Sequence, residues 1–382
     1  MKRWREIDAL RGLMLVLMTF THMPTRFSGP IGQPLGFVSA AEGFVFLSAF
    51  MAGYIFSRRA LKHGMKSMCK AFLLRAAKLY GCHVAMLIYL FTIIAAIGIT
   101  TDRQTIKNLI SFYLDDPVTA LTSSLALIYN PPLLDILPIY VAFMVLSPWI
   151  LMFGLRVSWK PVIVASIIVW LCAQFGLEKE AYQAARDFAG LKVPFHEIGS
   201  FDVLAWQLVW VIGLWMGAKV AVEPLRLGKL SASLVYLALA VALTGFLTRH
   251  MFGQAPFGDH TSLLVLINKW HLGPLRLLNF MALLILTLRF GPNIKNAIRW
   301  RFLEVLGAAS LPVFCVHLAV VLLALALIGD KQGATPVWQE IILLAVTFLT
   351  MYGTAWVFRA EPQSGTAHEA GDPPAVSARV VR

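Results

Sequence analysis

Long apolar runs, separated by short polar stretches, recur along the whole chain. Each run holds about 18 residues or more, which is enough for a helix to cross a hydrocarbon core of about 30 Å. A helix also pairs its own backbone N–H and C=O groups, as a segment inside lipid must. The pattern predicts ten membrane-spanning helices, near residues 7–24, 36–56, 72–99, 133–155, 160–177, 201–220, 231–249, 273–290, 304–328 and 337–358.

The composition agrees with an all-α polytopic membrane protein. Of the 382 residues, 58% are hydrophobic and 14% are charged, whereas soluble domains are about 45–50% apolar and about 25% charged. A membrane β-barrel is excluded because the apolar runs are continuous rather than alternating. We therefore assign residues 1–359 to one membrane domain. Residues 360–382 form a polar tail rich in Gly, Pro and Ala, a composition typical of disorder.

The chain has a net charge of +13, and its basic residues gather in short stretches between the apolar runs. With the N-terminus placed in the cytoplasm, most Lys and Arg residues fall on the cytoplasmic side, as the positive-inside rule requires. Both termini are therefore expected in the cytoplasm, and nucleic acid is not an expected partner. The cysteines and histidines show no metal-ligand spacing, so we expect neither disulfides nor a bound metal.

The first predicted span contains DALRGLMLVLMTFTH, which runs from Asp8 to His22. Arg11 and His22 lie eleven positions apart, so a helix presents both on one face, about 16 Å apart along its axis. Asp8 shares that face and could pair with Arg11. Ionisable groups within a span indicate a functional site. The alternatives are that Asp8 and Arg11 only reach toward the interface, and that His22 is an ordinary interfacial residue.

Three further ionisable residues lie within predicted spans, two of them near a span end and one in the middle. Glu42 lies near the outer end of the second span, at the depth expected for His22, and its carboxylate could orient His22 or accept its proton. Asp135 lies near the start of the fourth span, and His317 lies in the middle of the ninth. A lone histidine on an apolar helix is either a hydrogen-bonded packing residue or part of a site.

Seven cations follow the second span on the expected cytoplasmic side. They are Arg58, Arg59, Lys62, Lys66, Lys70, Arg75 and Lys78. Such residues commonly determine membrane topology. Their density would also suit a polyphosphate or nucleotide headgroup, because guanidinium and ammonium groups bind phosphate through charge-assisted hydrogen bonds.

Six segments, in order along residues 4–355, resemble the OpgC family, which belongs with the acyltransferase-3 type of integral membrane acyltransferases. They are REIDALRGLMLVLMTFTH, AAEGFVFLSAFMAGY, LLDILPIYVAFMVLSPW, FDVLAWQLVWVIG, KWHLGPLRLLNFMAL and LGAASLPVFCVH. The Ser-Gly-Phe common in the second span of acyltransferase-3 proteins reads Ser48-Ala49-Phe50 here. This departure favours the OpgC branch.

The resemblance implies a multi-pass enzyme of the bacterial inner membrane. Such an enzyme transfers an acyl group, typically succinyl, from a cytoplasmic coenzyme A thioester to a hydroxyl of a periplasmic glucan. The resemblance places the family's arginine on Arg11 and its essential histidine on His22, and it maps Ser310 and His317 onto a Ser-to-His stretch. We expect His22 to act as general base toward the hydroxyl. Direct attack and an acyl-histidine intermediate are both open.

The remaining candidates follow from the same resemblance. Glu42 or Asp135 would orient His22, and His317 is a further catalytic candidate. The phosphates of the acyl-CoA donor are expected at Arg11 and at four of the cations, Arg58, Arg59, Arg75 and Lys78. Two other functions stay open. One is a related acetyltransferase acting on another polysaccharide or an amino sugar, and the other is a non-enzymatic transporter or flippase.

Overall fold

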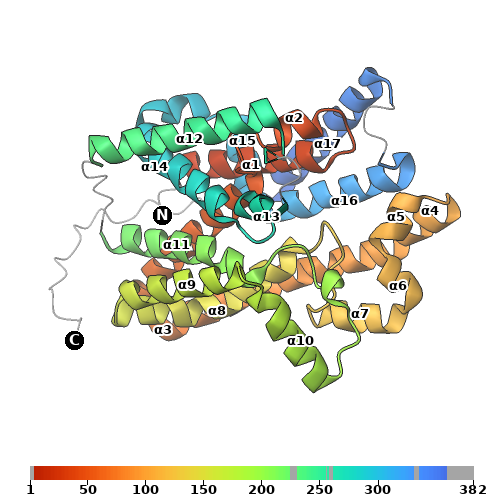
Figure 1. Ribbon diagram of the computed structural model, residues 1–382, viewed down its shortest axis with the longest axis horizontal. Coiled ribbons are helices and arrows are strands. Elements are labelled where there is room, and N and C mark those ends of the chain that lie inside the picture. Colours follow the sequence, from red (N-terminus) through yellow and green to blue (C-terminus); the bar gives the residue numbers. More distant parts are fainter. Residues whose placement is uncertain (1–3, 224–229, 255, 258–260, 331–334, 359–382) are drawn as a thin grey trace, which may run out of the picture.

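The computed structural model describes residues 4–223, 230–254, 256–257, 261–330 and 335–358, so the predicted tail lies outside the described residues. Nine long helices form the body of this part of the chain (Figure 1). They are α1 (Arg5–His22), α3 (Ala40–Tyr89), α8 (Ile136–Arg156), α9 (Trp159–Ala173), α11 (Val203–Val222), α12 (Ala232–Phe252), α14 (Pro274–Ile298), α16 (Ser310–Ile328) and α17 (Val337–Phe358).

Shorter helical elements connect the long ones. They are α2 (Ser28–Gly32), the π-helical turn η1 (Leu90–Ile94), α4 (Ala95–Thr100), α5 (Gln104–Leu109), α6 (Ser111–Asp115), α7 (Pro117–Leu125), α10 (Leu177–Ala189), η2 (Phe195–Glu197), α13 (Thr261–Leu264), η3 (Val265–Ile267) and α15 (Arg301–Ala308). Within the described residues, the only β-pairing is an isolated bridge between Leu35 and Val38. The all-α prediction is therefore confirmed for this part of the chain.

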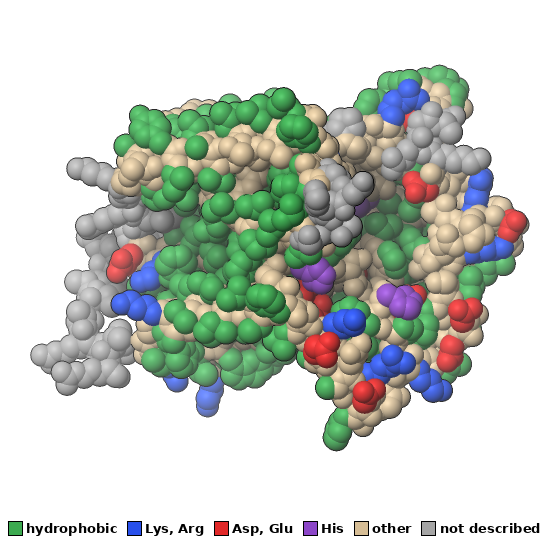
Figure 2. Space-filling model, viewed as in Figure 1, with side chains coloured by type: hydrophobic (Ala, Val, Ile, Leu, Met, Phe, Trp, Pro, Cys, Tyr) green, Lys and Arg blue, Asp and Glu red, His purple; other side chains and the backbone are tan. Residues whose placement is uncertain are grey.

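Seven of the described helices are long and apolar enough to cross a membrane, and α9 with α10, which meet at 80°, would make an eighth. The protein is therefore a multi-pass helical membrane protein. The helix α1 is not among the seven, because Arg5, Glu6, Asp8 and Arg11 fall in its first two turns. In Figure 2 a band of hydrophobic side chains crosses the middle of the molecule, and charged side chains gather toward its two ends.

The second and third predicted spans, 36–56 and 72–99, are joined without a long non-helical segment. The chain stays helical from Ala40 to Thr100, through the π-helical turn η1, except at Gly64, whose φ of 80° is favourable for glycine. Phe56 and Phe72 have ring centroids 3.9 Å apart, whereas a straight helix would separate them by about 24 Å. The chain therefore folds back at Gly64 as a helical hairpin. We call this side of the molecule the Gly64 end and the opposite side the His22 end.

The long helices pack in three groups (Figure 1). The helices α8 and α11 pack on α3, and α9 packs on α11. In a second group, α1 packs on α15, and α17 packs on both α15 and α16. The helices α12 and α14 pack on each other. Small residues allow helices to approach closely. A Cβ atom at Gly307 would collide with the carbonyl of Asp8, and one at Gly12 would collide with the carbonyl of Leu303.

This close approach positions α16 beside α1. The helix α15 ends at Ala308, and Ala309 leaves the helical conformation before α16 begins at Ser310. Ser310 and His317 are seven positions apart, about two helical turns, so they share one face of α16. Both side chains contact α1, Ser310 through Arg11 and His317 through His22.

Candidate functional site

The two histidines singled out in the sequence form a pair. Nδ1 of His22, the last residue of α1, lies 3.2 Å from Nε2 of His317 on α16. The rings are stacked, with centroids 5.4 Å apart and an interplanar angle of 19°. His317 is fully buried, whereas His22 is partly exposed. The periodicity of α1 could not predict this contact, because the partner lies on a helix near the other end of the sequence.

The hydrogen-bond network assigns the protons of the neutral pair. Nδ1 of His317 lies 3.2 Å from the carbonyl oxygen of Phe314, and a carbonyl can only accept, so this nitrogen carries a proton. Nε2 of His317 is then an acceptor, and Nδ1 of His22 donates to it. Nε2 of His22 is left without a proton, and no described residue hydrogen-bonds to it. This nitrogen can accept a proton from a substrate.

His22 lines a cavity of about 280 Å³ at the His22 end. Its polar lining comprises His22, Thr21, Ser39, Asp135, Ser200 and Lys269. Most of the remaining lining is apolar and includes Trp270 and Phe201. We call this space the His22 cavity.

Asp135 lines the His22 cavity but is engaged elsewhere. The residue precedes α8 and is buried, and its Oδ2 accepts a hydrogen bond of 3.1 Å from the backbone N–H of Ser200. In the described structure it makes no hydrogen bond to His22. Orientation of His22 by Asp135 therefore stays a prediction, and the structure gives His317 as the residue that contacts the imidazole.

Glu42 is placed differently from the sequence expectation. Its carboxylate accepts hydrogen bonds from the backbone N–H and the hydroxyl of Ser39, at 3.0 and 2.6 Å, and it forms a buried ion pair with Arg276 of α14. Among the described contacts, none joins Glu42 to His22. The Ser39–Glu42 capping box was readable in the sequence as Ser-x-x-Glu. Arg276 was also readable, as a charged residue at the edge of an apolar run.

A larger cavity of about 870 Å³ lies toward the Gly64 end, and we call it the Arg11 cavity. Arg11 hydrogen-bonds Ser310 there through its guanidinium. Arg75 and Lys78 also line this space, as two of the four predicted phosphate-binding cations.

The other two predicted cations, Arg58 and Arg59, do not line the Arg11 cavity. Arg58 donates to the hydroxyl of Tyr54 at 2.9 Å, and Arg59 donates to the hydroxyl of Ser67 at 2.9 Å across the hairpin. Local hairpin contacts account for both side chains.

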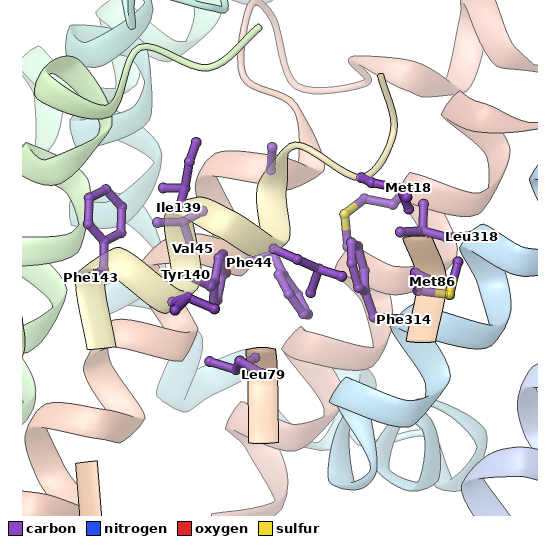
Figure 3. Close-up of a cluster of buried hydrophobic side chains, with 14 of the residues drawn as sticks. Met18, Phe44, Val45, Leu79, Met86, Ile139, Tyr140, Phe143, Phe314 and Leu318 are labelled. Carbon is purple, nitrogen blue, oxygen red and sulfur yellow. The ribbon is translucent and has the colours of Figure 1, made fainter. Parts of the chain in front are cut away.

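The two cavities meet at a shared apolar partition. Phe44, Ile136 and Phe314 line both of them. Figure 3 shows Phe44 and Phe314 within the buried cluster between α3, α8 and α16. Their ring centroids lie 5.8 Å apart with an interplanar angle of 21°. A space lined by Arg11, Arg75 and Lys78 thus adjoins a space lined by the His22 imidazole.

Comparison with known protein families finds a match over nearly the whole chain. A family model described as OpgC protein matches residues 2–362, a range that includes every residue lining the two cavities. No curated protein and no solved structure matches the chain.

Proposed function

Since the chain belongs to the OpgC family, whose model spans residues 2–362, we propose that it is a membrane-bound O-acyltransferase. It transfers an acyl group, succinyl, from cytoplasmic acyl-CoA to a hydroxyl of a periplasmic glucan. The observation that carries the proposal is the unprotonated Nε2 of His22, which lies in a cavity adjoining the cation-lined Arg11 cavity.

The proposed topology has ten spans in the bacterial inner membrane, with both termini in the cytoplasm. In this topology the two halves of α3 are separate spans, joined by the hairpin at Gly64. The Gly64 end then faces the cytoplasm, because the short basic stretches fall on that side. The His22 end faces the periplasm, where the glucan is.

The donor occupies both cavities in this proposal. Its phosphates bind near Arg75 and Lys78 in the Arg11 cavity, since charge-assisted hydrogen bonds to phosphate are strong. The pantetheine arm passes the apolar partition of Phe44 and Phe314. The thioester carbonyl then lies in the His22 cavity, and the sugar does not need to enter the membrane.

The reaction requires one proton acceptor. Nε2 of His22 takes the proton of the glucan hydroxyl while the hydroxyl oxygen attacks the thioester carbon. The C–S bond breaks, and the imidazolium of His22 returns the proton to the leaving coenzyme A sulfur. His317 accepts the Nδ1–H hydrogen bond throughout, so it holds the ring and stabilises the imidazolium.

We favour direct attack over an acyl-histidine intermediate. In the second step of that route, Nε2 would carry the acyl group and could not accept the proton of the hydroxyl. Nδ1 is already committed as the donor to His317. A second base would be needed, and Asp135, the carboxylate that lines the His22 cavity, makes no described hydrogen bond to His22.

The test uses purified protein with succinyl-CoA and glucan, with release of free thiol and the mass of the glucan as readouts. Wild-type protein is expected to release coenzyme A and to form succinylated glucan. His22→Asn is expected to lower transfer by roughly 10²–10⁴-fold, the usual contribution of a general base. Full transfer by a folded His22→Asn protein would refute the mechanism. Transfer from acetyl-CoA, supplied in a parallel reaction, with none from succinyl-CoA would correct the donor.

A further inference from the structure

Lys269 is a cation in the His22 cavity that the sequence did not single out. It lies in the connection between η3 and α14, and it is half-buried. Its ammonium nitrogen lies 4.6 Å from the ring centroid of Trp270 and 5.6 Å from that of Phe201. No described residue makes a hydrogen bond or an ion pair with the ammonium group of Lys269.

The carboxylates nearest to Lys269 have other partners. Glu42 is paired with Arg276 and bonded to Ser39, and Asp135 accepts the N–H of Ser200. Neither lies within ion-pair distance of Lys269, although both contribute to its electrostatic field. Burial lowers the pKa of the Lys269 ammonium, which reflects the cost of holding a cation away from water.

An anionic ligand would compensate this cation. We propose that Lys269 binds the free carboxylate of a dicarboxylic acyl group, such as succinyl, while the thioester carbon of that group lies at His22. The proposal rests on the function proposed above, and it names the residue that selects the acyl group. The phosphates of the donor bind in the other cavity, and the hydroxyl of the acceptor is neutral, so the acyl carboxylate is the anion that reaches this space.

The surroundings of Lys269 favour such selection. Trp270 and Phe201 hold the ammonium through cation–π contacts. Most of the rest of the cavity lining is apolar, including Met18, Val45 and Leu133. If the cavity held no cation, a carboxylate entering it would lose its hydrating water with no ion pair in exchange, which is costly. A neutral acyl group would leave the ammonium unpaired.

The experiment compares succinyl-CoA with butyryl-CoA, because both acyl groups have four carbons and only succinyl ends in a carboxylate. Wild-type protein in nanodiscs is expected to prefer succinyl in kcat/KM. Lys269→Met is expected to lower the succinyl-to-butyryl ratio by about tenfold or more, mainly through the KM for succinyl-CoA. Lys269→Arg should keep most of the preference, since it keeps the charge.

Lys192→Met is the matched control, because Lys192 is exposed and lies outside the His22 cavity. It should leave the ratio unchanged. The melting temperature of each variant is measured to show that it is folded. The affinities for succinyl-CoA and butyryl-CoA are measured as well, so that a Lys269→Met protein with slow turnover is still compared by its relative affinity for the two donors.

The outcomes separate the two proposals. An unchanged ratio in Lys269→Met would refute the assignment of Lys269 alone. Equal loss with both donors would also refute it, because a lysine that stabilises the oxyanion acts on both. Absence of transfer from either donor by wild-type protein would instead refute the proposed acyltransferase function.

Discussion

The contact between His22 and His317 leads to a quantitative prediction. In His317→Phe the ring volume is approximately kept, but the acceptor for the Nδ1–H of His22 is lost. The imidazolium formed during transfer then lacks a charge-assisted hydrogen bond, which contributes about 1.5–3 kcal/mol. This corresponds to a fall in kcat of about 10–150-fold. The KM for the acyl donor should change little, because His317 does not line either cavity.

His317→Gln is the matched variant, because a glutamine side chain can offer an amide oxygen near the position of Nε2. It should retain more activity than His317→Phe. Both are assayed for thiol release with succinyl-CoA and glucan, and their melting temperatures show that they are folded. Wild-type kcat in a folded His317→Phe protein would refute the assigned proton arrangement. Equal losses in the two variants would refute it as well.

Two further predictions concern stability. Gly307→Ala should lower the free energy of unfolding by about 1–3 kcal/mol, since its Cβ would collide with the carbonyl of Asp8. Gly353→Ala, with open space at its Cβ, should not lower the free energy of unfolding. Equal melting temperatures of the two variants would contradict this prediction. The Asp202 carboxylate, which lies 3.1 Å from His271, raises the pKa of that histidine above its ordinary value of 6.5. Because the pKa of His271 is higher in the folded state than in the unfolded state, its protonation stabilises the fold at pH values below the unfolded-state pKa. This stabilisation is lost as the pH rises through the folded-state pKa. The wild-type melting temperature should therefore fall more than that of His271→Gln between about pH 6 and pH 9, and parallel curves would contradict this.

The sequence predicted the helical architecture because apolar runs of sufficient length have few alternatives in lipid. It did not predict that the helices continue through residues 57–71 to a break at Gly64, because the cations there were interpreted only as the cytoplasmic connection between two spans. Arg and Lys are good helix formers, so the polar stretch continues the helix beyond the apolar segment. A glycine within that run was the available signal for the break.

The candidate site was predicted in part. Helical periodicity placed Arg11 and His22 on one face of α1, and the structure shows both contacting α16. Partners from distant segments, such as Lys269, depend on tertiary packing that local patterns do not encode. Glu42 shows the opposite case, since its capping signature was present but its position near a histidine suggested catalysis.

The most direct test of the account is transfer across a sealed membrane. Proteoliposomes are prepared with the Gly64 end outward, glucan is enclosed, and succinyl-CoA, which does not cross the bilayer, is added outside. The account predicts succinylated glucan inside and free coenzyme A outside, with neither formed by His22→Asn. Succinylation that occurs only when glucan and donor are on the same side of the membrane would contradict it.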